Sequence, residues 1–155
     1  MENKNTFALN QHVNHVATVR IFMEAFITRL KGRAMVHDGS KTSEPESYFF
    51  INDKNIIALN TTEYGSPEYK AALERGKEAV HHHQTHNRHH PEYYKNGING
   101  MCLVDLIEMI CDWKAATERN HNGDIWISIE KNKERFGIDD QLFSILKNTL
   151  DAMGW

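Results

Sequence analysis

Apolar side chains recur every three or four positions through most of the chain, which is the spacing of one face of an α-helix. The first such pattern predicts a helix over residues 7–30, with Gly32 at its end or at a kink. A short helix is expected over 34–41. Residues 48–59 favour a helix, although Phe49-Phe50-Ile51 also fits a strand.

The second half of the chain carries stronger helix signals. Ser66-Pro67-Glu68-Tyr69 predicts a helix start, with a capping serine and a proline in the first turn. This helix is expected to run into the histidines and to stop before Pro91, because the residue before a proline avoids the α region. Three further helices are predicted, over 101–119, from about 124 to Gly137, and over 139–153. We therefore expect an all-α fold, with residues 1–155 as one domain.

Composition and charge exclude several classes of protein for this chain. The chain has 155 residues, 40% hydrophobic and 25% charged, with a net charge of −3. That charge provides no basic surface for duplex nucleic acid. The chain has no apolar run long enough for a bilayer, and residues 1–6 lack a signal-peptide pattern, so we expect a cytoplasmic location. Cys102 and Cys111 are expected to be small buried hydrophobic residues.

Histidine is the most informative residue type in this chain. Six of the ten histidines lie within residues 81–90, and imidazole is a preferred ligand for borderline transition metals. On a helix, residues three or four apart share a face, which groups His12 with His15, His82 with His86, and His86 with His90 if the helix persists. We expect one or two of the six clustered histidines to bind metal, with His81 the first to be excluded.

Acidic residues supply the complementary ligands. Asp105, Glu108 and Asp112 are spaced to line one face of the 101–119 helix, where acids beside a buried face need cations or a metal. His37-Asp38 offers an imidazole and a carboxylate side by side. The alternative for that doublet is a buried, hydrogen-bonded pair without metal, and His121 is expected to be structural.

The order of these residues resembles the HD phosphohydrolase superfamily. His12, His37-Asp38 and Asp112 follow its ligand order, the His12–Ala17 segment resembles its first-helix motif, and His37-Asp38-Gly-Ser-Lys41 resembles its HDxxK form. His12 is favoured over His15 by this match. The resemblance implies an HD-domain-like helical bundle, which often forms a homodimer.

A second resemblance covers nearly the whole chain, from about His12 to Leu150. The segments HDGSK…EPE, HxxHNRHHPEYY and M…DLIEMICDWKAATER are similar to an uncharacterised family of phage and bacterial proteins, a "domain of unknown function". This family implies motif positions but no substrate.

The HD resemblance implies a hydrolase that uses metal-activated water. The expected metal ligands come from four parts of the chain: His12, His37, Asp38, His82, His86, His89, His90 and Asp112. One or two ions of Mn, Fe, Co, Ni or Zn suit such a site better than Mg. Lys41 and Arg88 are the expected phosphate contacts, and Glu46 or Glu108 would orient the water or act as general base.

The predicted function is therefore a metal-dependent phosphohydrolase, a phosphomonoesterase or phosphodiesterase. Its expected substrate is a nucleotide or a similar small phosphorylated molecule. The alternative is a catalytically silent module of the same fold that sequesters a nucleotide signal or binds a host protein.

Overall fold

A computed structural model describes residues 4–63, 65–119 and 122–155. The described residues form α-helices and short 3₁₀ turns, with no strand among them, so the all-α fold class is confirmed. His121 lies outside the described ranges. The chain divides into two compact units, residues 1–37 and 38–155, and the expectation of one domain over 1–155 stays a prediction. None of the helices in the described ranges combines the length and apolar character needed to cross a membrane.

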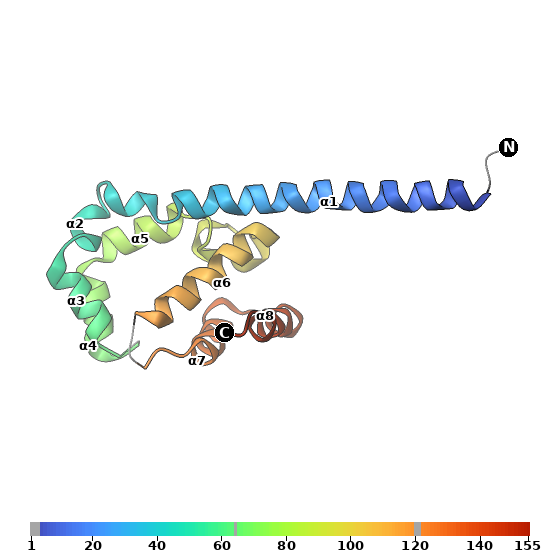
Figure 1. The fold of residues 1–155 in the computed structure, drawn as a ribbon. Helices are drawn as coiled ribbons and strands as arrows, with labels where there is room; N and C mark the ends of the chain where they lie inside the picture. The colour runs from blue at the N-terminus through green and yellow to red at the C-terminus, as the bar shows by residue number, and fades with distance from the viewer. Residues whose placement is uncertain (1–3, 64, 120–121) are drawn as a thin grey trace. The chain divides into compact units, whose positions relative to one another are not determined.

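The first unit contains a single long helix, α1 (Lys4–Val36), which Figure 1 shows as unbroken. It continues through Gly32, so the expected end at that residue is wrong. One glycine costs a helix only about 1 kcal/mol relative to alanine, and the residues around it are good helix formers. The short helix expected over 34–41 is also wrong, because α1 takes its first residues and the 3₁₀ turn η1 (Gly39–Thr42) takes its last.

The second unit opens with four helices, α2 (Ser47–Phe50), α3 (Asp53–Thr61), α4 (Pro67–Arg75) and α5 (Lys77–His86). The helical preference of residues 48–59 is confirmed, with an interruption at Asn52, whose side chain caps α3. Ser66 caps α4 as predicted, accepting a hydrogen bond from the Tyr69 amide at 3.1 Å. The single helix expected from there into the histidines is broken at Gly76.

Gly76 has a packing role at this break. A Cβ built on it would lie 2.3 Å from the ring of Phe49, which is 2% exposed. The absence of a side chain therefore lets α2 pack against the α4–α5 junction.

The histidine segment is helical up to His86 and forms a turn over residues 87–90, in which the His90 amide donates to the Asn87 carbonyl at 3.1 Å. Helix α5 ends at His86, and Asn87 is already extended. His90 is extended before Pro91, as predicted, and Pro91 begins the 3₁₀ turn η2 (Pro91–Tyr93). The helix therefore does not persist from His86 to His90. A further 3₁₀ turn, η3 (Gly97–Gly100), leads into the next helix.

The main hydrophobic core joins the last three helices, α6 (Leu103–Glu118), α7 (Ile125–Phe136) and α8 (Asp140–Met153) (Figure 1). Asp124 and Asp139 cap α7 and α8 with their side chains, and Gly137 ends α7 in the left-handed conformation at φ 59°. The buried residues of this core are Ile98, Met109, Ile110, Trp113, Ile125, Ile129, Ile138, Phe143, Leu146 and Leu150.

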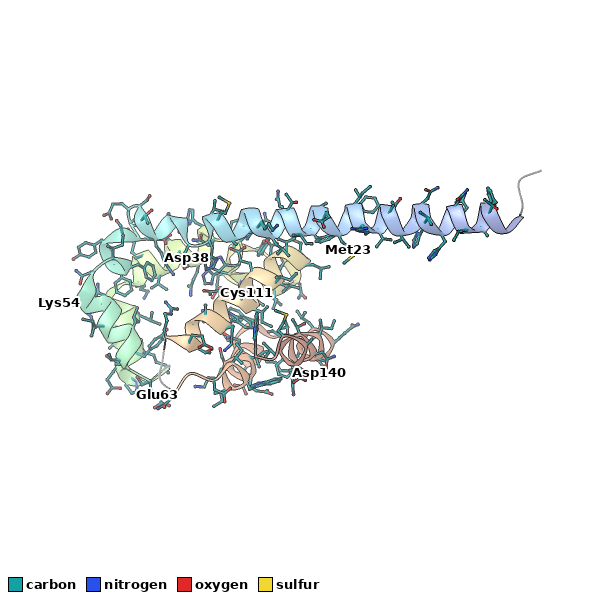
Figure 2. All side chains as sticks on the ribbon, viewed as in Figure 1. Met23, Asp38, Lys54, Glu63, Cys111 and Asp140 are labelled. Atoms are coloured by element: carbon teal, nitrogen blue, oxygen red, sulfur yellow. The ribbon has the colours of Figure 1, made fainter. Side chains whose placement is uncertain are left out.

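Burial of the two cysteines was predicted wrongly. Both Cys102 and Cys111 are exposed. Cys102 precedes α6 as its capping residue, and Cys111 lies on the face of α6 that turns away from Met109, Ile110 and Trp113. Helix α6 buries one face only, so an apolar residue type does not by itself place a side chain inside. Figure 2 labels Cys111 on this helix.

Leu150→Ala tests the core. Leu150 is fully buried, whereas Ile145 on the same helix is 53% exposed. We expect the Leu150 variant to lose about 2–5 kcal/mol of unfolding free energy, because deletion leaves a cavity. The Ile145→Ala control should lose under about 1 kcal/mol.

Urea unfolding followed by tryptophan fluorescence measures both variants. All three tryptophans are in this region, since Trp113 belongs to the core and Trp126 and Trp155 pack against it. Equal losses in the two variants would contradict the assignment of α8's buried face.

Candidate metal centre

Asp38 lies at the start of the second unit and has an uncommon backbone conformation (Figure 2). Its φ of 57° and ψ of 16° place it in the left-handed region, which is uncommon for residues other than glycine, although Asp and Asn adopt it more readily than most. The Oδ2 atom forms an ion pair with Lys41. The Oδ1 atom lies 3.2 Å from His83 Nε2 and 3.4 Å from His89 Nε2.

Three histidines converge beside this carboxylate. His83, His89 and His90 each offer a ring nitrogen, and the three nitrogens lie within 4.8 Å of one another. His83 comes from α5, and the other two come from the turn before Pro91. His83 is 5% exposed and His89 is 2% exposed. The Nε2 atom of His90 is buried and has no hydrogen-bond partner among the described residues.

The protonation state of His90 suits metal binding. Burial lowers its pKa to about 3, with a further contribution from His89 and His83, while Asp112 and Asp38 act in the opposite direction. The imidazole is therefore neutral at pH 7, which is the form that coordinates metals. A buried imidazole nitrogen without a hydrogen-bond partner needs a ligand of some kind, and a transition metal fits a set of three imidazoles and a carboxylate.

Glu46 supports His83 from the other side of the ring. It is fully buried, and its Oε2 atom lies 2.8 Å from His83 Nδ1. Ser40 donates to the same oxygen at 2.8 Å, and Oε1 lies 2.7 Å from His82 Nδ1. Burial raises the pKa of Glu46, but hydrogen bonds from His82, Ser40 and His83 and the charge of His83 together hold it below its ordinary value.

Helix α6 supplies further acids around His89. Glu108 Oε1 lies 3.3 Å from His89 Nδ1. Asp112 offers a carboxylate oxygen within 4.8 Å of a ring nitrogen of His89. The structure therefore places Asp38 and Asp112, far apart in sequence, next to the same imidazole.

Arg88 and Asp105 form a separate pair between the histidine segment and α6. Nε and Nη2 of Arg88 each lie 3.2 Å from a different oxygen of Asp105, which also accepts from the Cys102 amide at 3.0 Å. Asp105 is fully buried. Burial opposes ionisation, yet the hydrogen bonds from Arg88 and Cys102 hold the pKa of Asp105 well below its usual range. This pair joins the segment to the helix that carries Glu108 and Asp112.

The structure does not bring all the expected ligands into this cluster. His82 contacts Glu46, and His86 is exposed and stacks on His82, with ring centroids 3.8 Å apart. His12 and His37 belong to the first unit, His12 within α1 and His37 immediately before Asp38. As site residues, these four histidines stay predictions.

Sequence reasoning missed His83. Its helical position carried the signal, because it lies four residues after Ala79, and both residues are buried on α5. A histidine that shares the buried face of an otherwise polar helix needs partners for both nitrogens. The i, i+4 spacing of His82 and His86 favours a different face of the helix.

Comparison with known proteins identifies the family. The chain belongs to a family of unknown function, DUF5662, whose model matches residues 1–152. No curated protein and no solved structure matches the chain. The family places the whole chain in one group of related sequences and assigns it no activity.

Arg88→Ala tests the joint between the histidine segment and α6. The Arg88 side chain is 46% exposed, but the substitution leaves the buried Asp105 carboxylate without its cation, so we expect a loss of about 1–3 kcal/mol in unfolding free energy at pH 7. Arg88→Lys should lose less unfolding free energy than Arg88→Ala, because lysine keeps the charge but cannot form the bidentate contact with Asp105.

The pH dependence of this loss follows from the lowered pKa of Asp105. A carboxyl group with a lowered folded-state pKa contributes stability above its unfolded pKa, near 3.8, and loses it as the pH falls through the folded value. The difference between wild type and Arg88→Ala should therefore shrink from pH 7 toward pH 3. Urea titrations across this range measure it, and a difference that grows on acidification would contradict the pairing.

Proposed function

We propose that this protein is a metal-dependent phosphohydrolase that acts on a nucleotide or a similar small phosphorylated molecule. The observation that carries the proposal is the convergence of His83, His89 and His90 beside Asp38. A transition metal bound there lowers the pKa of a coordinated water and polarises a phosphoryl oxygen. Mn, Fe, Co, Ni and Zn suit these donors.

The ligand order supports the reaction class. The HD-type resemblance implies a His-Asp pair of ligands followed by a later Asp, and His37-Asp38 and Asp112 follow this order. Asp38 and Asp112 both lie next to His89, as a shared centre requires. On this proposal the fold is of the HD type.

The surrounding side chains have separate tasks in this proposal. Lys41, which pairs with Asp38 Oδ2, is the phosphate-binding cation of this proposal, since a charged donor binds phosphate strongly. Arg88 is engaged by Asp105, so its contribution is to hold the histidine segment. Glu108, beside Nδ1 of His89, orients that imidazole, as outer carboxylates do for metal-bound histidines.

The proposal predicts a bound transition metal and phosphoester hydrolysis. Protein purified without chelator should contain Mn, Fe, Co, Ni or Zn by elemental analysis. It should hydrolyse at least one member of a panel of nucleoside phosphates, cyclic nucleotides and nitrophenyl phosphates. Asp38→Asn and His90→Ala should lower both metal content and kcat/KM, by more than the roughly 10–100-fold typical of removing an outer-shell partner.

Two controls make this test specific. His81→Ala removes an exposed histidine of the same segment and should change neither metal content nor turnover. Asn at position 38 tolerates the left-handed conformation, so the Asp38 variant tests the carboxylate rather than the backbone. A nucleotide that protects the protein against thermal unfolding but is recovered intact would contradict hydrolysis and favour a binding module.

A further inference from the structure

Glu46 is fully buried near the candidate metal centre, and it does not lie among the converging ligand atoms. Its oxygens meet three donors: His82 at 2.7 Å, and Ser40 and His83 at 2.8 Å each. A carboxylate whose two oxygens meet three such groups accepts hydrogen bonds from them. The proton between Glu46 and His83 therefore belongs to Nδ1 of the histidine.

The amide of Asn87 leads to the same conclusion. Its Nδ2 group donates to Ser40 Oγ at 2.8 Å and to the His83 carbonyl at 2.8 Å. These two bonds use both of its hydrogens. Nδ2 also lies 3.1 Å from His83 Nδ1, but it has no hydrogen left to donate there. The Ser40 hydroxyl, which accepts from Asn87, is free to donate its own hydrogen to Glu46.

This chain of bonds fixes the tautomer of His83. With a hydrogen on Nδ1, a neutral imidazole has its lone pair on Nε2. That atom faces Asp38 Oδ1 at 3.2 Å. When the imidazole is neutral, two acceptors at this distance repel each other, and either a proton on Nε2 or a metal ion between the two atoms removes that repulsion. A metal ion that replaces the proton would bind through the Nε2 lone pair.

We propose that Glu46 is a positioning residue of the metal centre, which holds the Nδ1 hydrogen of His83 and so directs its Nε2 lone pair to the ion. This inference rests on the metal centre of the proposed function but not on the phosphoester chemistry. It assigns Glu46 a task different from orienting water or acting as general base. Ser40 and Asn87 extend the support by one further bond each.

Glu46→Gln tests the assignment through metal affinity. Glutamine has similar size, but it carries no charge and only one acceptor oxygen for three donors. We expect the Kd for Co²⁺, measured by chelator competition, to rise by about 10–100-fold. Ser40→Ala removes one donor and should give a smaller rise. Glu44→Gln is the matched control on the same segment, since Glu44 is exposed, and it should bind Co²⁺ as wild type does.

A tautomer measurement separates positioning from general stability. Long-range ¹H–¹⁵N correlation spectra of the metal-free protein should show His83 protonated at Nδ1 in the wild type and in Glu44→Gln, and a mixture of tautomers in Glu46→Gln. An unchanged tautomer together with an unchanged Kd in Glu46→Gln would overturn the inference. If Glu46→Gln does not fold, the same two measurements on Ser40→Ala decide.

Failure of this inference is distinguishable from failure of the proposed function. If the wild-type protein binds Co²⁺ tightly but hydrolyses no phosphoester, the proposed reaction is contradicted, whereas the positioning role of Glu46 is not. A wild-type protein that binds no transition metal overturns both.

Discussion

The close approach of the Asp38 carboxylate to two imidazoles is the constraint on which the candidate site depends. Its Oδ1 atom faces Nε2 of His83 and Nε2 of His89 at 3.2 and 3.4 Å. With the opposite nitrogen of His83 donating to Glu46, this arrangement brings electron-rich atoms together. A proton on the imidazole nitrogen, or a metal ion between the atoms, turns that repulsion into attraction. Asp38 has a left-handed backbone conformation in this position, as residues at functional sites often do.

Two fully buried acids secure the histidine segment from opposite sides. Glu46 anchors the end of α5 through His83, and Asp105 anchors the following loop to α6 through Arg88. Both acids remain ionised because each collects several donors, which offset the cost of burial. The histidines between these anchors are thereby held in fixed positions, as a precise metal site needs.

Local sequence signals determined much of the helical framework. The caps Ser66, Asp124 and Asp139, the stop before Pro91 and the end of α7 at Gly137 are where local rules place them. The expected helix boundaries were wrong at two other glycines, Gly32 and Gly76. Helix α1 passes through Gly32, whereas Gly76 breaks a helix that was expected to continue. The difference lies in the surroundings, because the ring of Phe49 packs where a side chain at Gly76 would be.

The sequence by itself determined the residue types of the site, since a run of histidines with Asp38 and Asp112 at a distance suffices to suggest a metal. Only the tertiary structure decided which histidines converge. It turned His82 toward Glu46, left His86 exposed, and brought His83 to Asp38. The tertiary structure also pairs Arg88 with Asp105. The physical reason is that a helix fixes only the direction of each side chain, whereas the partner it meets comes from another segment, whose position depends on how the whole unit packs.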